Sequence, residues 1–331
     1  MEYRSIKGFT GWGQMGFLFA FLGLGFVLLM GVQTLFAMQM LPAGKSLMDA
    51  DATLKAMMAP ENVGMARAMQ VISTFVLMFI PAVLWNFICN GKNMLWLGFS
   101  KHINVFQILL GFMIIFSAAI AASPLEDFTK SIVAHFPSIN AMAQRLEDLY
   151  KQQAMALSNL KNIQEYIIAL FIMAFFPAMF EEVFFRGTMQ NLFVKWLKNP
   201  IVAIVITSLI FSLIHSSIYL FLSRAVLGFA LGLMYYKTKN IWVNIIAHFL
   251  NNAFALTALY TMKTKTGKVD LDKIDPHVHW SIGLIGIVAL VGLFIMLTKY
   301  STKNKAKIEG EERILVAASL PKEPITHFQN N

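Results

Sequence analysis

Residues 163–194 have the sequence IQEYIIALFIMAFFPAMFEEVFFRGTMQNLFV. This run is long and apolar enough to span a bilayer, which takes about 20 mainly apolar residues in a helix. It nevertheless carries two adjacent glutamates, Glu181 and Glu182, well inside the apolar segment. A charge at that depth costs at least about 2.5 kcal/mol on insertion scales. The run therefore predicts a membrane-spanning helix whose carboxylates find partners elsewhere in the chain.

The composition of the whole chain is that of an integral membrane protein. Of its 331 residues, 57% are hydrophobic and 14% are charged, whereas a soluble domain has about 25% charged residues. The net charge is +9, but the basic residues lie mostly at the ends of apolar runs, as the positive-inside rule predicts, so we expect no nucleic-acid partner. Cys89 is the only cysteine, which excludes an intramolecular disulfide or a cysteine metal cluster.

Apolar runs along the chain predict an all-α fold, a polytopic membrane helical bundle of about eight transmembrane helices around a buried polar cavity. The fifth and sixth runs are short and meet at Ser216-Ser217, so they also fit a hairpin that does not fully cross. The eight runs are 12–38, 69–89, 104–123, 163–194, 200–217, 218–236, 241–262 and 280–298.

The distribution of polar residues predicts four parts of the chain. They are the N-terminal transmembrane helices 1–3 (1–125), an amphipathic external insert (126–162), a transmembrane core that contains the buried charged groups (163–300) and a charged cytoplasmic tail (301–331). If there are eight spans, the short loops rich in Lys and Arg all fall on one side. We therefore expect a multi-pass protein of the plasma (inner) membrane with both termini cytoplasmic.

The charged groups inside the spans are few, and their spacing suggests which of them pair. Glu182 and Arg186 are four residues apart, so they share a helical face and can form an ion pair. Glu181 points about 100° away from Glu182 and is free to face a cavity. This spacing predicts a structural carboxylate at Glu182 and a chemical one at Glu181.

Two further spans each contribute one polar face. Phe211 and His215 are four residues apart, as are His248 and Asn252. A glutamate and a histidine can deprotonate a water, directly or through a metal, and a histidine and an asparagine can stabilise an oxyanion. Glu181, His215 and His248 are also candidate ligands of a divalent metal such as zinc, but no HExxH motif is present, so the residues leave open whether there is a metal or none.

The three motifs Glu181-Glu182-x-x-x-Arg186, Phe211-x-x-x-His215 and His248-x-x-x-Asn252 together resemble the CPBP intramembrane protease family. That family includes type II CAAX prenyl proteases and bacteriocin-processing and immunity-type members. The resemblance covers about residues 165–262. It implies a bundle of about eight helices around a cavity open to the cytoplasmic side and the membrane.

The resemblance also implies roles for the motif residues. Glu181 would activate the water with help from His215, and His248 and Asn252 would stabilise the oxyanion. Supporting roles would fall to Glu182 and Arg186, which brace the first motif, and to Phe211. Family members are often described as metalloproteases, and a metal-free glutamate mechanism is the other description.

These observations predict an intramembrane endopeptidase, with a divalent metal or with none, that hydrolyses a peptide bond by glutamate- and histidine-activated water. The expected partners are membrane lipid and a membrane-associated or prenyl-type protein or peptide substrate. One alternative is a proton-coupled membrane transporter that uses a Glu/His relay, although the inverted repeats common in transporters are not seen. The other is a non-catalytic bacteriocin-immunity or scaffold protein of the same fold.

Overall fold

The computed structural model describes residues 3–158, 160–267 and 278–319. Within these ranges the chain forms helices and connecting loops and no β-strand, which confirms the all-α prediction. Segments η1 and η3 are 3₁₀ helices, and segments η2, η4 and η5 are π-helical. In chain order the elements are α1 (Gly11–Met40), α2 (Ala50–Met58), η1 (Pro60–Asn62), α3 (Val63–Thr74), η2 (Phe75–Phe79), α4 (Ile80–Cys89), η3 (Met94–Leu97), α5 (Val105–Ala122), α6 (Pro124–Val133), α7 (Pro137–Leu157), α8 (Ile163–Ala169), η4 (Leu170–Phe175), α9 (Phe176–Glu182), η5 (Val183–Gln190), α10 (Asn191–Leu197), α11 (Pro200–Ile214), α12 (Phe221–Thr238), α13 (Ile241–Thr266) and α14 (Trp280–Ser319).

Six continuous helical stretches among the described residues are long and apolar enough to cross a membrane, so the chain is an integral membrane protein. The predicted count of eight is not confirmed, because the fifth and sixth predicted spans form the hairpin α11–α12. Helix α11 has only 15 residues, or about 22 Å, and α12 contains Arg224 and Lys237. The six stretches are Gly11–Met40, Pro60–Cys89, Val105–Val133, Ile163–Leu197, Ile241–Thr266 and Trp280–Ser319.

Two of the long stretches contain a proline preceded by a π-helical segment. In Pro60–Cys89, η2 ends two residues before Pro81, and in Ile163–Leu197, η4 ends two residues before Pro177. Proline lacks an N–H and its ring clashes with the carbonyl of the preceding turn. A wider π turn relieves that clash, and π segments are frequent at functional sites. Pro177 therefore accounts for the π-helical segment η4 that precedes Glu181 in this continuous helical stretch.

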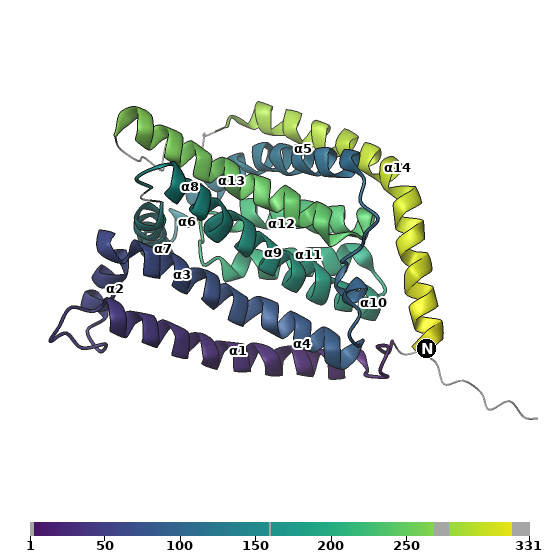
Figure 1. Ribbon diagram of the computed structural model, residues 1–331. Coiled ribbons are helices and arrows are strands. Elements are labelled where there is room, and N and C mark those ends of the chain that lie inside the picture. Colours follow the sequence, from purple (N-terminus) through teal and green to yellow (C-terminus); the bar gives the residue numbers. More distant parts are fainter. Residues whose placement is uncertain (1–2, 159, 268–277, 320–331) are drawn as a thin grey trace, which may run out of the picture.

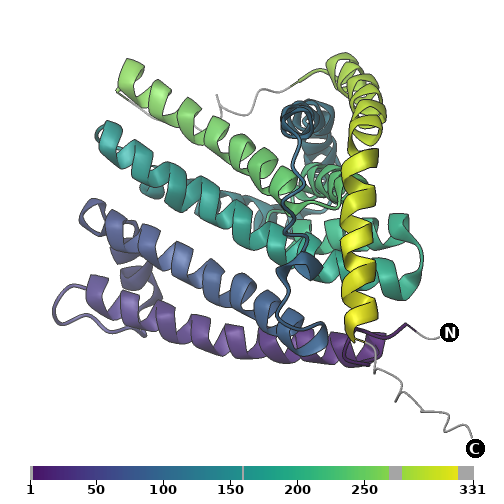
Figure 2. The same ribbon diagram turned by 45° about the vertical axis from the view of Figure 1, so that its right-hand side comes forward.

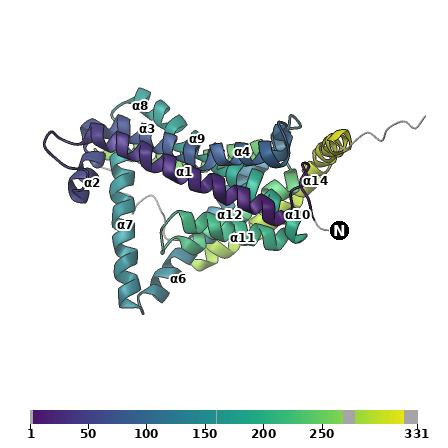
Figure 3. The same cartoon turned by 90° about the horizontal axis from the view of Figure 1, so that it is seen from below.

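The long helices lie side by side, and α7 runs crosswise to them (Figures 1 and 3). Helices α1, α3 and α4 form one edge of the bundle, while α5 and the first part of α14 run together at the opposite edge (Figure 1). The hairpin α11–α12 packs against α5 and α13 in between. The insert predicted at 126–162 thus contains α6 and α7, and α7 lies at the end of the bundle opposite the N-terminus (Figure 3).

Residues 301–319, the described part of the segment expected as a charged tail, continue helix α14 (Figure 2). The helix bends after running beside α5 and crosses the end of the bundle where the N-terminus lies (Figures 1 and 2). Ser301 is fully buried and accepts a hydrogen bond from Gln107 (2.9 Å). Farther along, Glu312 pairs with Lys239. These contacts attach the charged part of α14 to the loops at this end.

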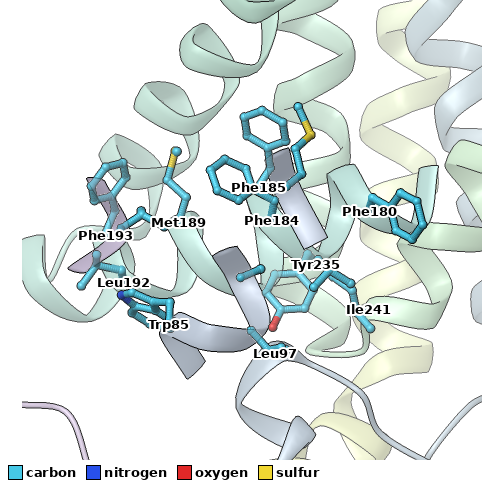
Figure 4. Close-up of a cluster of buried hydrophobic side chains, with 14 of the residues drawn as sticks. Trp85, Leu97, Phe180, Phe184, Phe185, Met189, Leu192, Phe193, Tyr235 and Ile241 are labelled. Carbon is cyan, nitrogen blue, oxygen red and sulfur yellow. The ribbon is translucent and has the colours of Figure 1, made fainter. Parts of the chain in front are cut away.

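The largest apolar core packs α1 and α4 against the stretch that carries the two glutamates (Figure 4). Trp85 is 2% exposed, and its indole N–H donates to the carbonyl of Gln14 (3.0 Å). Phe184 and Phe185 of η5 are buried in the same core. This core fixes the rotation of η5 and α9 about their axis, and therefore the direction in which Glu181 and Glu182 point.

Gly187 lets η5 approach the loop before α5 closely. A Cβ atom at this position would lie 2.7 Å from the carbonyl oxygen of Leu97. We expect Gly187→Ala to destabilise the protein by about 1–3 kcal/mol, the usual cost of overpacking. The measurement is the thermal unfolding midpoint in detergent. Gly16→Ala on α1, where a Cβ meets nothing within 4 Å, is the control and should not lower the midpoint.

Candidate active site

Glu182 is the centre of a buried polar cluster. Its side chain is fully buried, and Oε1 lies 3.1 Å from Nη1 of Arg186, so the predicted ion pair is present. Its two oxygens also accept hydrogen bonds from Nδ1 of His248 (2.9 Å) and Nδ2 of Asn244 (3.1 Å). A buried carboxylate is tolerable only with such partners. The cluster therefore ties α9 and η5 to α13.

Arg186 is held by contacts on several sides. The guanidinium donates through Nη2 to the carbonyl of Gly228 on α12 (3.1 Å). Its carbon lies 4.8 Å from the centre of the Phe211 ring and 5.8 Å from that of Phe185, both within range of a cation–π interaction. Phe211 also packs against His215, with ring centres 4.6 Å apart. Phe211 thus supports both the arginine and the imidazole.

Glu181 points away from this cluster and lies between the two histidines. Its Oε2 atom is 3.8 Å from Nε2 of His248 and 4.0 Å from Nε2 of His215. The Glu181 side chain is 15% exposed, whereas that of Glu182 is fully buried. Both distances exceed a hydrogen bond, and contacts of this length at apo sites often tighten or accommodate a water. The predicted division between a held and a free carboxylate is therefore found in the geometry.

The hydrogen bonds of the two imidazoles fix their tautomers. Nδ1 of His215 lies 2.7 Å from the carbonyl oxygen of Phe211, and Nδ1 of His248 faces the carboxylate of Glu182. A carbonyl or an ionised carboxylate can only accept, so we assign the proton to Nδ1 in both rings. In each neutral ring Nε2 is then an acceptor. The two nitrogens therefore lie 3.8 Å and 4.0 Å from a third acceptor, Oε2 of Glu181, and a donor such as water can bridge them.

Asn252 is the one motif residue that the structure does not tie to the others. It lies on α13 one turn beyond His248 and is half-buried. Within the described residues its side chain makes no hydrogen bond, so its amide N–H groups are available to a ligand. The other predicted site residues are brought together, namely Glu181, Glu182, Arg186, Phe211, His215 and His248.

Two functional contacts were not predicted. Asn244 bridges Glu182 and the carbonyl of Leu231 (2.7 Å). It lies four residues before His248, so the helical spacing of that motif could have indicated it. Arg224 donates through Nη1 to the carbonyl of His215 (3.1 Å). No spacing rule points to that contact.

The predicted metal candidates do not form a metal site in this arrangement. Among the described residues, no group of three or more His, Cys, Asp or Glu side chains could hold a metal ion. Nδ1 of His248 is engaged by Glu182, and the two Nε2 atoms lie 3.8 Å and 4.0 Å from Oε2 of Glu181.

Comparison with known proteins places these motifs in a defined domain. Residues 163–254 match the model of the Rce1-like family, described as type II CAAX prenyl endopeptidase Rce1-like. The match contains all three motifs, from Glu181 to Asn252. The predicted resemblance is thereby confirmed for this segment.

Two curated proteins of Bacillus subtilis (strain 168) are similar to the chain. YpbD, described as uncharacterized, is 33% identical over 106 residues, which is 31% of this chain and 49% of YpbD. YdiL, provisionally described as a membrane peptidase, is 30% identical over 95 residues, or 28% of this chain and 38% of YdiL. The similarity thus spans half or less of these relatives. No solved structure matches the chain significantly.

Proposed function

We propose, on the premise that residues 163–254 form an Rce1-like domain, that this protein is an intramembrane endopeptidase that uses Glu181 to activate water. The observation that carries the proposal is the position of Oε2 of Glu181, 3.8 Å from Nε2 of His248 and 4.0 Å from Nε2 of His215. All three atoms are acceptors when the rings are neutral, and a water molecule supplies two donors. A nucleophilic water would therefore be both bound and oriented there.

The proposed reaction begins with proton transfer from this water to the Glu181 carboxylate. The Nε2 atom of His215 accepts the second water proton as a hydrogen bond and orients the attack. The hydroxide oxygen bonds to the scissile carbonyl carbon, and the carbonyl π electrons move to oxygen to give a tetrahedral oxyanion. When the C–N bond breaks, the proton held by Glu181 passes to the leaving amine.

His248 and Asn252 are proposed to stabilise the oxyanion. Because Nδ1–H of His248 is committed to Glu182, its Nε2 can donate to the oxyanion only when the ring is doubly protonated. In that state Glu181 and His215 alone accept from the water. The free amide of Asn252 can donate without any change of protonation.

We expect His248→Ala and Asn252→Ala each to lower kcat by about a hundredfold, the usual loss for an oxyanion donor, while KM changes little. The measurement is steady-state cleavage of a fluorogenic substrate peptide by the purified protein. Asn251→Ala, the neighbouring amide on α13, is the matched control and should retain turnover. An increase of KM with kcat unchanged would instead assign these side chains to substrate binding.

The substrate proposed is a membrane-associated protein or peptide, with prenylated CAAX peptides as the first chemistry to test. We infer that the end of the bundle carrying the N-terminus, Lys239 and Lys305 is cytoplasmic, since basic loops face that side. The membrane is proposed to be the plasma (inner) membrane. Both termini would then be cytoplasmic.

The testing experiment compares membrane proteomes of cells that express wild type or Glu181→Gln at equal levels. New protein N-termini present only with the wild type would support proteolysis and identify a substrate and its cleavage site. In parallel, a fluorogenic farnesylated CAAX peptide would be offered to the purified protein. No wild-type-specific terminus and no peptide cleavage would count against the endopeptidase and in favour of a transporter or a non-catalytic protein.

A further inference from the structure

Helix α7 contacts the loop that follows His215. This helix belongs to the insert and lies outside the segment that matches the Rce1-like model. The loop comprises residues 216–220 and turns the chain from α11 into α12. Its Ser217 hydroxyl lies 3.3 Å from Oε2 of Glu147, and its Tyr219 hydroxyl donates to Oδ1 of Asn140 (2.6 Å). Ala143, which is 1% exposed, packs in the same small apolar cluster as Tyr219. Contacts from three successive turns of α7 therefore converge on this loop.

These α7 residues share one face of the helix. Asn140, Ala143, Glu147 and Tyr150 follow the spacing i, i+3, i+7, i+10, which keeps side chains on one side of a helix. Tyr150 stacks on the guanidinium of Arg224, with the guanidinium carbon 5.2 Å from the ring centre. Asn140, Glu147 and Tyr150, in a helix that runs crosswise to the spans (Figure 3), thus contact the segment from the loop to the start of α12.

The loop is joined directly to the proposed catalytic histidine. Arg224, which Tyr150 covers, donates to the backbone carbonyl of His215 (3.1 Å). The next residue, Ser216, has a φ of +53°. A non-glycine residue in that region costs about 1 kcal/mol or more and persists only where its surroundings hold it. The contacts between α7 and the loop supply such surroundings for Ser216, the residue directly after His215.

We propose that this face of α7 is a positioning element that holds Nε2 of His215 against the water bound by Glu181. The inference rests on the proposed function, because it assigns His215 to the same hydrolytic site. His215 caps the end of α11, and its ring is held by the Phe211 carbonyl. Movement of the loop would tilt this cap and change the 4.0 Å separation between Nε2 and Oε2 of Glu181. Asn140, Glu147 and Tyr150 touch no reacting atom and act through the loop.

The test compares two double variants of α7 by hydrogen exchange. Asn140→Ala/Glu147→Ala removes both side chains that accept hydrogen bonds from the loop. As a control, Arg145→Ala/Gln152→Ala changes two exposed residues that lie on another face of α7. In detergent, we expect the first variant to speed amide exchange in residues 216–220 and the second to leave it at the wild-type rate. Unchanged exchange in the first variant would refute the claim that α7 restrains residues 216–220. This readout does not depend on activity.

The second readout is turnover of a peptide that spans a wild-type-dependent cleavage site. Asn140→Ala/Glu147→Ala should lower kcat about tenfold with KM within about twofold, since small misplacements of catalytic groups slow chemistry more than binding. Asn140→Asp/Glu147→Gln keeps both acceptor oxygens and should restore kcat. Faster exchange with normal kcat would overturn the positioning role. If instead Glu181→Gln cleaves as the wild type does, the proposed function has failed. The exchange result would still show whether α7 restrains the loop.

Discussion

Glu181→Gln should lower the rate of cleavage about a hundredfold to ten-thousandfold, the range expected for loss of a general base. Glutamine keeps the size of the side chain, but its amide cannot take a proton from water. It would also present an N–H donor to a gap where the neutral His215 and His248 offer acceptors, so it would occupy the place of the water. The measurement is single-turnover cleavage of the identified peptide by purified protein.

Folding must be unaffected for that result to assign the chemistry. Glu181 makes no ion pair shorter than 3.8 Å among the described residues, so its neutralisation should leave the unfolding midpoint close to that of the wild type. Glu165→Gln removes an acidic group from the same long helical stretch, near its opposite end and partly exposed. This control should cleave normally. Cleavage by Glu181→Gln at the wild-type rate would refute the proposed mechanism.

Glu182→Gln should lower the free energy of unfolding by about 3–5 kcal/mol, because it leaves a buried guanidinium without its counter-charge. Arg186 is fully buried and would keep only the Gly228 carbonyl and two aromatic faces. Arg186→Met should cost less, since the Glu182 carboxylate would still be bound by His248 and Asn244. The measurement is denaturant unfolding in mixed micelles, followed by tryptophan fluorescence.

The pair Glu126–Lys130 on α6 is the matched control. It has the same i,i+4 spacing and a short contact of 2.6 Å, but its side chains are 17% and 39% exposed. Glu126→Gln should therefore change stability by less than about 1 kcal/mol. The double variant Glu182→Gln/Arg186→Met should be more stable than Glu182→Gln alone. Equal losses at Glu126 and Glu182 would mean that burial does not govern the strength of the Glu182–Arg186 pair.

The sequence was sufficient to predict the all-α membrane fold and the Glu182–Arg186 pair. Both depend on local patterns, namely apolar runs of span length and a four-residue helical spacing. The count of eight spans is not confirmed, because run length alone does not tell a hairpin from two crossings. Helix α11 ends at Ile214, where the loop that carries Ser216 at positive φ turns the chain back. The loop contacts that set this turn come from α7, far away in the sequence.

The site was predicted as a set of residues but not as a network. Asn244 follows the same four-residue spacing as His248 and Asn252 and was within reach of the motif analysis. The carbonyls of Gly228 and Leu231 could not be foreseen, because any backbone carbonyl can accept and only the packing of α12 places these two. The same holds for the assigned tautomer of His248, which depends on Glu182 lying 2.9 Å from Nδ1.

The short α11 helix has a consequence for the lipid around it. Its outer face is apolar and exposed, at residues such as Ile201, Val205 and Leu209, yet the helix is only about 22 Å long. The hydrocarbon layer is about 30 Å thick, so if α11 crosses it, the bilayer thins locally to match the shorter apolar surface. Annular lipids beside His215 would then be compressed. A helical substrate segment that diffuses into that thinned zone would have its ends hydrated earlier than elsewhere. Its helix would then unwind more easily near the proposed hydrolytic site.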